Sequence, residues 1–203
     1  MLLLASCKIG DDGTGDGDHG SGDTDNGGVG DPDNTGGSDS TGGTDVDDRL
    51  IFGSGISTKI IRSASESSEE LRQLLVEMKN KISDTTDGSA AMDDDVAAQS
   101  AHEIVVGDTQ RPISAAARRA LERAMRLELR KEENSEEEIL TFTIYAEGGS
   151  VAIVYSDERV MEDAVSYFLD NYFVGDSLLL EDGYSHSETV TLLEYLRAED
   201  EES

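Results

Sequence analysis

The sequence predicts an α/β domain, with helices packed on a mixed sheet, preceded by a disordered tether. From position 49 onward, apolar residues follow helical spacing in some segments and short strand-like runs in others. These segments alternate as strand, helix, strand, helix, strand, strand, helix. One pair of strands is joined by a glycine turn typical of an antiparallel hairpin. Before position 49 the chain has too few apolar residues to form a core.

The tether is expected at 8–48, which consists almost wholly of Gly, Asp, Ser, Thr and Asn. Its only apolar side chains are Ile9, Val29 and Val46, so we expect a solvated, extended coil. The acidic run 11–18 superficially resembles a calcium loop. An EF-hand loop ends in a bidentate Glu, however, and no Glu occurs before Glu66. Weak, nonspecific cation binding is therefore the better interpretation.

The first seven residues, MLLLASC, end in two small residues before a cysteine. This segment resembles the lipobox of bacterial lipoproteins, which implies a lipid on Cys7. It also implies an outward-facing place in the bacterial cell envelope, with membrane contact only through that lipid. A secretory signal has an apolar stretch of about 7–15 residues before cleavage. Because 1–7 is shorter, it is either a truncated signal whose start lies upstream or a chance match that leaves Cys7 a free thiol.

The charge balance excludes nucleic acid as a partner. Lys and Arg total 16 against 45 Asp and Glu, which gives a formal net charge of -29. Binding to phosphate backbones depends on neutralisation by Lys and Arg, so this chain would be repelled. Trp is absent and aromatic residues make up 5%, which leaves few rings for a sugar-stacking platform. A single cysteine excludes an intrachain disulfide.

The first half of the domain at 49–203 predicts one strand and one helix. Residues 57–62 (STKIIR) are typical of a short strand. A helix start follows at Ser67-Ser68-Glu69-Glu70, with apolar residues at helical spacing from Leu71 to Ile82. The segment 84–100 is acidic and aperiodic, and we expect an acidic loop there.

The second half predicts the remaining elements. They are a strand at 102–106, a helix at 114–129, a hairpin of 139–146 and 150–155 around Gly148-Gly149, a helix from its cap Asp157 to Phe173, a short strand at 177–180, and a strand or helical turn at 190–196.

The segment Glu103 to Ser114 reads EIVVGDTQRPIS. It resembles the strand-turn-helix signature of the noncatalytic N-terminal α/β domain of bacterial α-glucuronidase and hexosaminidase-type glycoside hydrolases. The segment 160–173 (VMEDAVSYFLDNYF) is similar to a helix of the same family, and the resemblance spans about 57–185. It implies a zincin-like fold without zinc, no cofactor, no catalytic residue in this chain, and a catalytic barrel domain as partner. The chain departs from the family at Tyr155-Ser156, where a Gly pair is usual, and at Ile113, where an acid is usual.

Six residues of this motif are interpreted as structural: Glu103, Gly107, Asp108, Thr109, Arg111 and Pro112. Gly107 allows an unusual dihedral where the chain leaves the strand. Asp108 and Thr109 are expected to accept hydrogen bonds from backbone N–H groups at the helix start, and Pro112 presets its first turn. Arg111 is expected to bridge a neighbouring carboxylate or domain.

The sequence does not fit the motifs of several other catalytic or ligand-binding sites. A zinc-protease HExxH beginning at His102 needs a second His at position 106, which is Val106. His19, His102 and His186 lack ligand spacing, so no metal site is predicted. No serine lies in a GxSxG elbow. Gly148-Gly149 precedes a strand rather than a helix, so it is not a phosphate loop.

These observations favour a noncatalytic accessory or interaction domain of a bacterial surface lipoprotein associated with carbohydrate processing. Its partner is a catalytic or other protein domain, contacted through Tyr145, Tyr155 or Tyr172. One alternative is the N-terminal fragment of a glycoside hydrolase whose catalytic barrel is missing. Another is an independent glycan-binding lipoprotein.

Overall fold

The computed structural model describes residues 49–202 except 66–67, 86 and 132–136. The chain divides into two units, Met1–Gly43 and Thr44–Ser203, and every described residue belongs to the second. The predictions for Cys7 and for the linker 8–48 lie outside the described residues.

The domain is built on a mixed six-stranded sheet, which confirms the predicted fold class. The strand order is β3-β2-β4-β6-β5-β8. The first four strands of this order are parallel, and β5 is antiparallel to both β6 and β8. Their bounds are β2 Ser57–Arg62, β3 Ser89–Asp94, β4 Glu103–Val106, β5 Ile139–Glu147, β6 Ser150–Tyr155 and β8 Ser185–Thr191. A separate two-stranded ribbon pairs β1 (Leu50–Phe52) with β7 (Leu178–Leu179).

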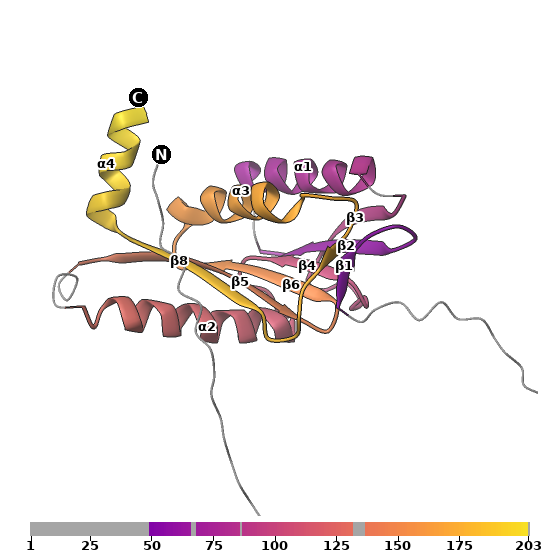
Figure 1. Ribbon diagram of the computed structural model, residues 1–203, viewed down its shortest axis with the longest axis horizontal. Coiled ribbons are helices and arrows are strands. Elements are labelled where there is room, and N and C mark those ends of the chain that lie inside the picture. The colour runs from indigo at the N-terminus through magenta and orange to yellow at the C-terminus, as the bar shows by residue number, and fades with distance from the viewer. Residues whose placement is uncertain (1–48, 66–67, 86, 132–136, 203) are drawn as a thin grey trace, which may run out of the picture. The chain divides into compact units, whose positions relative to one another are not determined.

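Helices cover both faces of the sheet, giving three layers (Figure 1). α1 (Glu69–Thr85) and α3 (Met161–Tyr172) lie on one face, and α2 (Pro112–Glu128) lies on the other. A fourth helix, α4 (Leu192–Glu202), follows β8.

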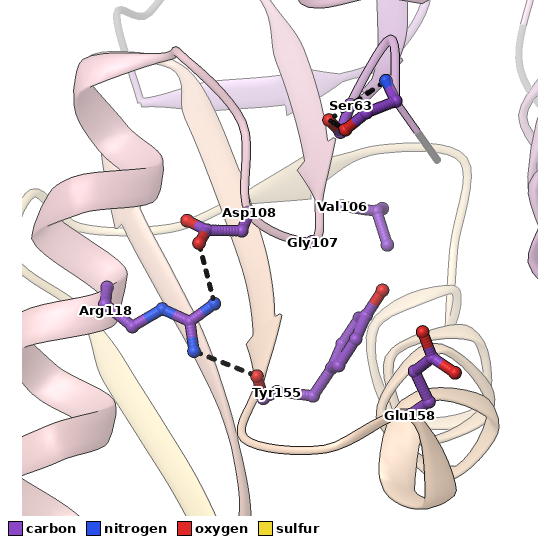
Figure 2. Close-up of a pocket in the computed structure, with 8 residues that line it drawn as sticks. Ser63, Val106, Gly107, Asp108, Arg118, Tyr155 and Glu158 are labelled. Carbon is purple, nitrogen blue, oxygen red and sulfur yellow. Dashed lines mark hydrogen bonds and ion pairs between the residues drawn. The ribbon is translucent and has the colours of Figure 1, made fainter. Parts of the chain in front are cut away.

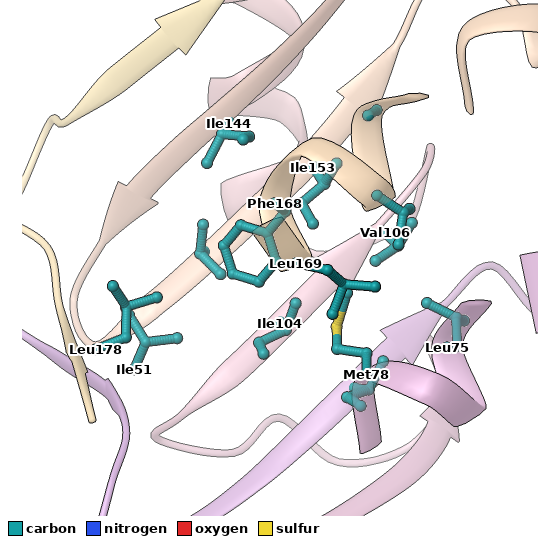
Figure 3. Close-up of a cluster of buried hydrophobic side chains, with 14 of the residues drawn as sticks. Ile51, Leu75, Met78, Ile104, Val106, Ile144, Ile153, Phe168, Leu169 and Leu178 are labelled. Carbon is teal, nitrogen blue, oxygen red and sulfur yellow. The ribbon is translucent and has the colours of Figure 1, made fainter. Parts of the chain in front are cut away.

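The core is divided by the sheet into two clusters. Because side chains alternate along a strand, Ile104 and Val106 face α1 and α3, whereas Val105 between them faces α2. The larger cluster includes Leu75, Met78, Phe168 and Leu169 from the two helices (Figure 3). The smaller cluster joins α2 to the sheet through Ile113, Ala117 and Leu121.

One predicted segment needs correction, and for another the structure contains both of the predicted alternatives. The acidic loop expected at 84–100 contains β3, which pairs in parallel with β2 at the sheet edge. Its inward residues Ala90 and Met92 are only partly buried, so an edge strand of this composition has no strong apolar alternation to reveal it. The segment 190–196 contains the end of β8 and the start of α4. The predicted cap Asp157 accepts a hydrogen bond from the Arg159 N–H (3.0 Å) and caps a 3-10 turn, Glu158–Val160, that leads into α3.

Candidate functional site

The carboxyl ends of β2, β4 and β6 meet at one edge of the sheet. After β2 the chain continues to α1 on one face, and after β4 it continues to α2 on the other (Figure 1). Where the connections of neighbouring parallel strands diverge in this way, a crevice opens outside the strand ends, and α/β proteins commonly bind ligands there. The predicted strand-turn-helix motif supplies one wall of this crevice.

A buried ion pair holds the base of the motif. Arg111 Nε donates to Glu103 Oε2 at 2.9 Å, and both side chains are buried. The other guanidinium nitrogens donate to backbone carbonyls, Nη1 to Asp95 (3.2 Å) and Nη2 to Ala97 (2.9 Å). Glu103 Oε1 also accepts from the Ser100 N–H (2.8 Å). Arg111 therefore ties the segment after β3 to β4.

Asp95 is a buried carboxylate that sequence reasoning missed, because it lies in the segment predicted as a loop. Its two oxygens accept the backbone N–H groups of Ala64 and Gln110, each at 2.9 Å. Burial by itself raises the pKa of Asp95, but these two hydrogen bonds, with the charge of Arg111, outweigh it and lower the pKa below its ordinary value. Asp95 thus joins the loops after β2, β3 and β4.

The turn after β4 is stabilised from within. Gly107 has a φ of 81°, and its N–H donates to the Ile153 carbonyl at 2.9 Å. Ser114 Oγ donates to the Gly107 carbonyl (3.0 Å) and accepts from the Thr109 N–H (3.2 Å). Thr109 Oγ1 accepts from the Arg111 N–H (3.2 Å), and Pro112 begins α2. Asp108 is exposed and lies 3.5 Å from Arg118 Nη2.

A polar cavity of about 310 Å³ lies beside this turn (Figure 2). It is lined by Ser63, Ser65, Val106, Gly107, Asp108, Arg118, Tyr155 and Glu158. Arg118 Nη1 donates to the Tyr155 carbonyl at 3.0 Å, while Arg118 Nη2 faces Asp108. The Ser63 and Ser65 hydroxyls are 2.8 Å apart. The cavity thus gathers hydroxyl, carboxylate and guanidinium groups around a tyrosine ring.

The lining residues come from four segments: the loop after β2, the turn after β4, the second turn of α2, and the end of β6 with the following 3-10 turn. Among the predicted motif residues, Gly107 and Asp108 line the cavity. Glu103, Thr109 and Arg111 do not line it and instead hydrogen-bond within the motif, and Pro112 lines a second cavity of about 380 Å³ with Ser100 and Glu147. Sequence reasoning did not select Ser63, Arg118 or Glu158.

The two histidines in the described part of the chain take part in packing. His102 Nδ1 lies 2.7 Å from the Leu50 carbonyl, which links β4 to β1. The His186 ring stacks on Tyr167 with centroids 4.9 Å apart. Within the described ranges, no three His, Cys, Asp or Glu side chains are grouped so that they could hold a metal ion. Nor does any helix there have the length and apolar character needed to span a membrane.

A second notable surface is on α4, which stands apart from the other helices in Figure 1. Its start is capped reciprocally: the Thr191 N–H donates to Glu194 Oε2 (3.1 Å), and the Glu194 N–H donates to Thr191 Oγ1 (3.3 Å). Tyr195 Oη donates to the Arg159 carbonyl (2.7 Å). Leu193 and Leu196 remain 46% and 47% exposed. We call these two leucines the α4 face.

Comparison with known proteins identifies no family. No family model matches the chain, and no curated protein matches it. A solved structure titled "Structure of CpGH84D" is a weak structural neighbour, with a TM-score of 0.37 and 10% identity. The match covers 68% of this chain and 22% of that one, so the chain spans about a fifth of that structure. The resemblance of 103–114 to a glycoside-hydrolase accessory domain therefore stays a prediction.

Proposed function

We propose that this chain is a noncatalytic interaction domain of a bacterial cell-envelope lipoprotein and that it packs against a carbohydrate-processing protein domain. The observation that carries this proposal is the α4 face. Helices as short as α4 are marginal in water unless an apolar stripe is packed, and both leucines of this stripe are about half exposed. Burying their remaining surface would contribute about 2 kcal/mol to association.

The hydrogen bonds that the motif residues make within the domain support a structural rather than a catalytic role. Glu103, Arg111 and Asp95 hydrogen-bond to one another's chain segments, and none of the three lines the cavity. Their charges are therefore committed to holding loops together, and they are not presented to a substrate. The association with carbohydrate processing rests on the resemblance of 103–114 to the accessory domain described above.

The chemistry of the partner follows from the charge of the chain. The two leucines of the α4 face are apolar, and the net charge of the chain is -29. A partner surface with an apolar groove and a basic rim would complement both features. Acidic surfaces would be repelled.

In-cell photo-crosslinking tests the interaction. A photoreactive residue is placed at Leu196 in the full chain, and at Glu122, an exposed position on α2, as a matched control. We expect Leu196 alone to give an adduct with a carbohydrate-processing protein. That purified protein should bind the full chain, and Leu193→Ser/Leu196→Ser should weaken binding without lowering the thermal midpoint. Equal adducts at both positions, or adducts only with a second copy of this chain, would overturn the proposal.

Two further measurements address the anchor and the chemistry. Palmitate labelling of the full chain should disappear in Cys7→Ser, and labelling that persists would contradict a lipid on Cys7.

The full chain should show no turnover of chromogenic glycosides. Turnover that copurifies with the chain would favour the alternative of a glycoside hydrolase, as would an in-frame catalytic barrel in the genomic sequence beyond Ser203.

A further inference from the structure

We infer that the cavity at the ends of β2, β4 and β6 binds one ring of a neutral, hydroxyl-rich ligand, that is, a single saccharide residue. This binding is separate from the interaction through the α4 face. It is carried by the convergence of polar groups on a cavity of about 310 Å³, which is at the small end of ligand pockets in proteins.

The balance of donors and acceptors selects the chemistry of the ligand. Arg118 offers only donors, Asp108 and Glu158 offer only acceptors, and the Ser63 and Ser65 hydroxyls offer both. An anion needs donors and a cation needs acceptors. Each hydroxyl of a sugar both donates and accepts, so a wall that mixes the two kinds suits a polyhydroxy ring.

The charges in the wall disfavour anionic ligands. Asp108 partly neutralises Arg118 across 3.5 Å, and Glu158 adds a further negative charge, so an anion would meet net repulsion. The wall's net negative charge does not repel a cation, but a cation cannot accept a hydrogen bond from the Arg118 donors. A neutral hydroxyl ligand meets no charge repulsion and can use both the donors and the acceptors.

The wall is positioned before any ligand arrives. Arg118 Nη1 donates to the Tyr155 carbonyl (3.0 Å), which fixes the guanidinium at the cavity edge (Figure 2). The absence of a side chain at Gly107 leaves room for Tyr155, because a Cβ at Gly107 would lie 3.1 Å from Tyr155 Oη. The Tyr155 ring and Val106 add apolar surface against which a sugar ring can lie. A preorganised site loses less entropy on binding.

Titration of the full chain with neutral monosaccharides, followed by amide NMR, tests this inference. Glucose, galactose, mannose and N-acetylglucosamine are the probes, and glucuronate and glucosamine are charged comparisons. We expect at least one neutral sugar to bind with a millimolar Kd and to shift the amides of Ser63, Gly107 and Tyr155. Arg118→Met should weaken binding about tenfold or more, because a hydrogen bond to a charged group is lost. Arg123→Met, at an exposed position on the same helix, should leave it unchanged.

The same titration with methyl glycosides identifies the source of the ring. Retained binding indicates the end of a glycan chain, and lost binding indicates a free sugar. The inference is overturned if no neutral sugar shifts these amides, if a charged sugar binds more tightly, or if Arg118→Met binds like the parent chain. The Leu193→Ser/Leu196→Ser variant should bind sugar normally, so failure of the two proposals can be told apart.

Discussion

At the scale of single residues, the buried ion pair of Glu103 and Arg111 is expected to contribute strongly to the stability of the fold. Glu103 is 1% exposed and Arg111 is 7% exposed, so removing one charge strands the other away from water. We expect Glu103→Ala to lower the free energy of unfolding by about 3–5 kcal/mol, measured by urea denaturation. Arg72→Ala, which removes the exposed partner of Glu69, is the control and should leave the urea midpoint unchanged. Equal effects of the two variants would contradict the structural role of Arg111.

Asp95 makes part of the stability depend on pH. Its pKa is lowered in the folded state from an ordinary value of 3.8. A carboxylate with a lowered pKa stabilises the fold above its unfolded pKa, and this contribution is lost as pH falls through the folded pKa. Asp95→Asn should therefore cost about 1–3 kcal/mol at pH 7, because one of two buried N–H groups loses its acceptor.

The cost of Asp95→Asn should stay constant down to about pH 5 and shrink below about pH 4. Urea denaturation of both proteins across this range measures it. A cost that grows on acidification would show that the carboxylate is not the stabilising form.

Gly107 is needed for two separable reasons, its dihedral and its closeness to Tyr155. Gly55 has a similar φ of 75°, against 81° at Gly107, but an added Cβ there meets nothing within 4 Å. Gly55→Ala should cost about 1–2 kcal/mol for the backbone alone. Gly107→Ala should cost more, and Tyr155→Phe should reduce the excess, as a double-mutant cycle in urea would show. Equal costs at the two glycines would exclude the contact.

At the scale of elements, β3 is the clearest departure from the predicted structure. The Ser89 N–H donates to the Ile56 carbonyl (3.0 Å) just before β2, and the Asp95 N–H donates to the Arg62 carbonyl (2.9 Å) at the end of β2, so both ends of β3 are bonded to its neighbour. Hydrogen exchange should therefore be slow at both amides, and slower than at the exposed Val96. Fast exchange throughout 84–100 would restore the loop interpretation.

The elements differ in how much the sequence reveals. β2 and β6 were predicted at their observed bounds because apolar, β-branched runs end at polar residues or glycine. β3 reads SAAMDD and lacks such residues. For α4, where 190–196 is predicted as a strand or a helical turn, the sequence carries a stronger helix signal, since Thr191-Leu192-Leu193-Glu194 is a capping box before a helix. The strand β8 (SHSETVT) is polar and lies at the edge of the sheet, where it pairs with β5. The periodicity of its own sequence does not reveal this pairing.

The candidate site was less predictable than the elements. The glycine turn at Gly107 was identified because its local chemistry is contained in a few adjacent residues. Ser63, Arg118 and Glu158 are distant in sequence and meet only because β2, β4 and β6 are neighbours in the sheet. Strand order is a property of long-range packing, so no local pattern contains it.

At the scale of the whole molecule, the acidity of the folded part works against the compact state. Residues 49–203 carry 33 Asp and Glu against 15 Lys and Arg, a net charge of -18, and the other -11 of the chain's -29 lies in 1–48. Like charges on a folded domain lie closer together than in the unfolded chain, so their repulsion favours unfolding. Salt screens this repulsion, with a Debye length that falls from about 30 Å at 0.01 M to about 10 Å at 0.1 M. We expect the urea midpoint at pH 7 to rise with NaCl and then level off once the Debye length is shorter than typical charge spacings.

The same titration near pH 4.1 supplies the control, because the sequence pI lies there and the net charge is close to zero. The NaCl dependence should then largely disappear. A midpoint that falls with NaCl at pH 7 would mean that attractive surface pairs, such as Arg72 with Glu69, outweigh the net repulsion. The expected rise would assign the energetic cost of acidity to the summed charge of the folded residues, while the buried pairs act locally and are screened little.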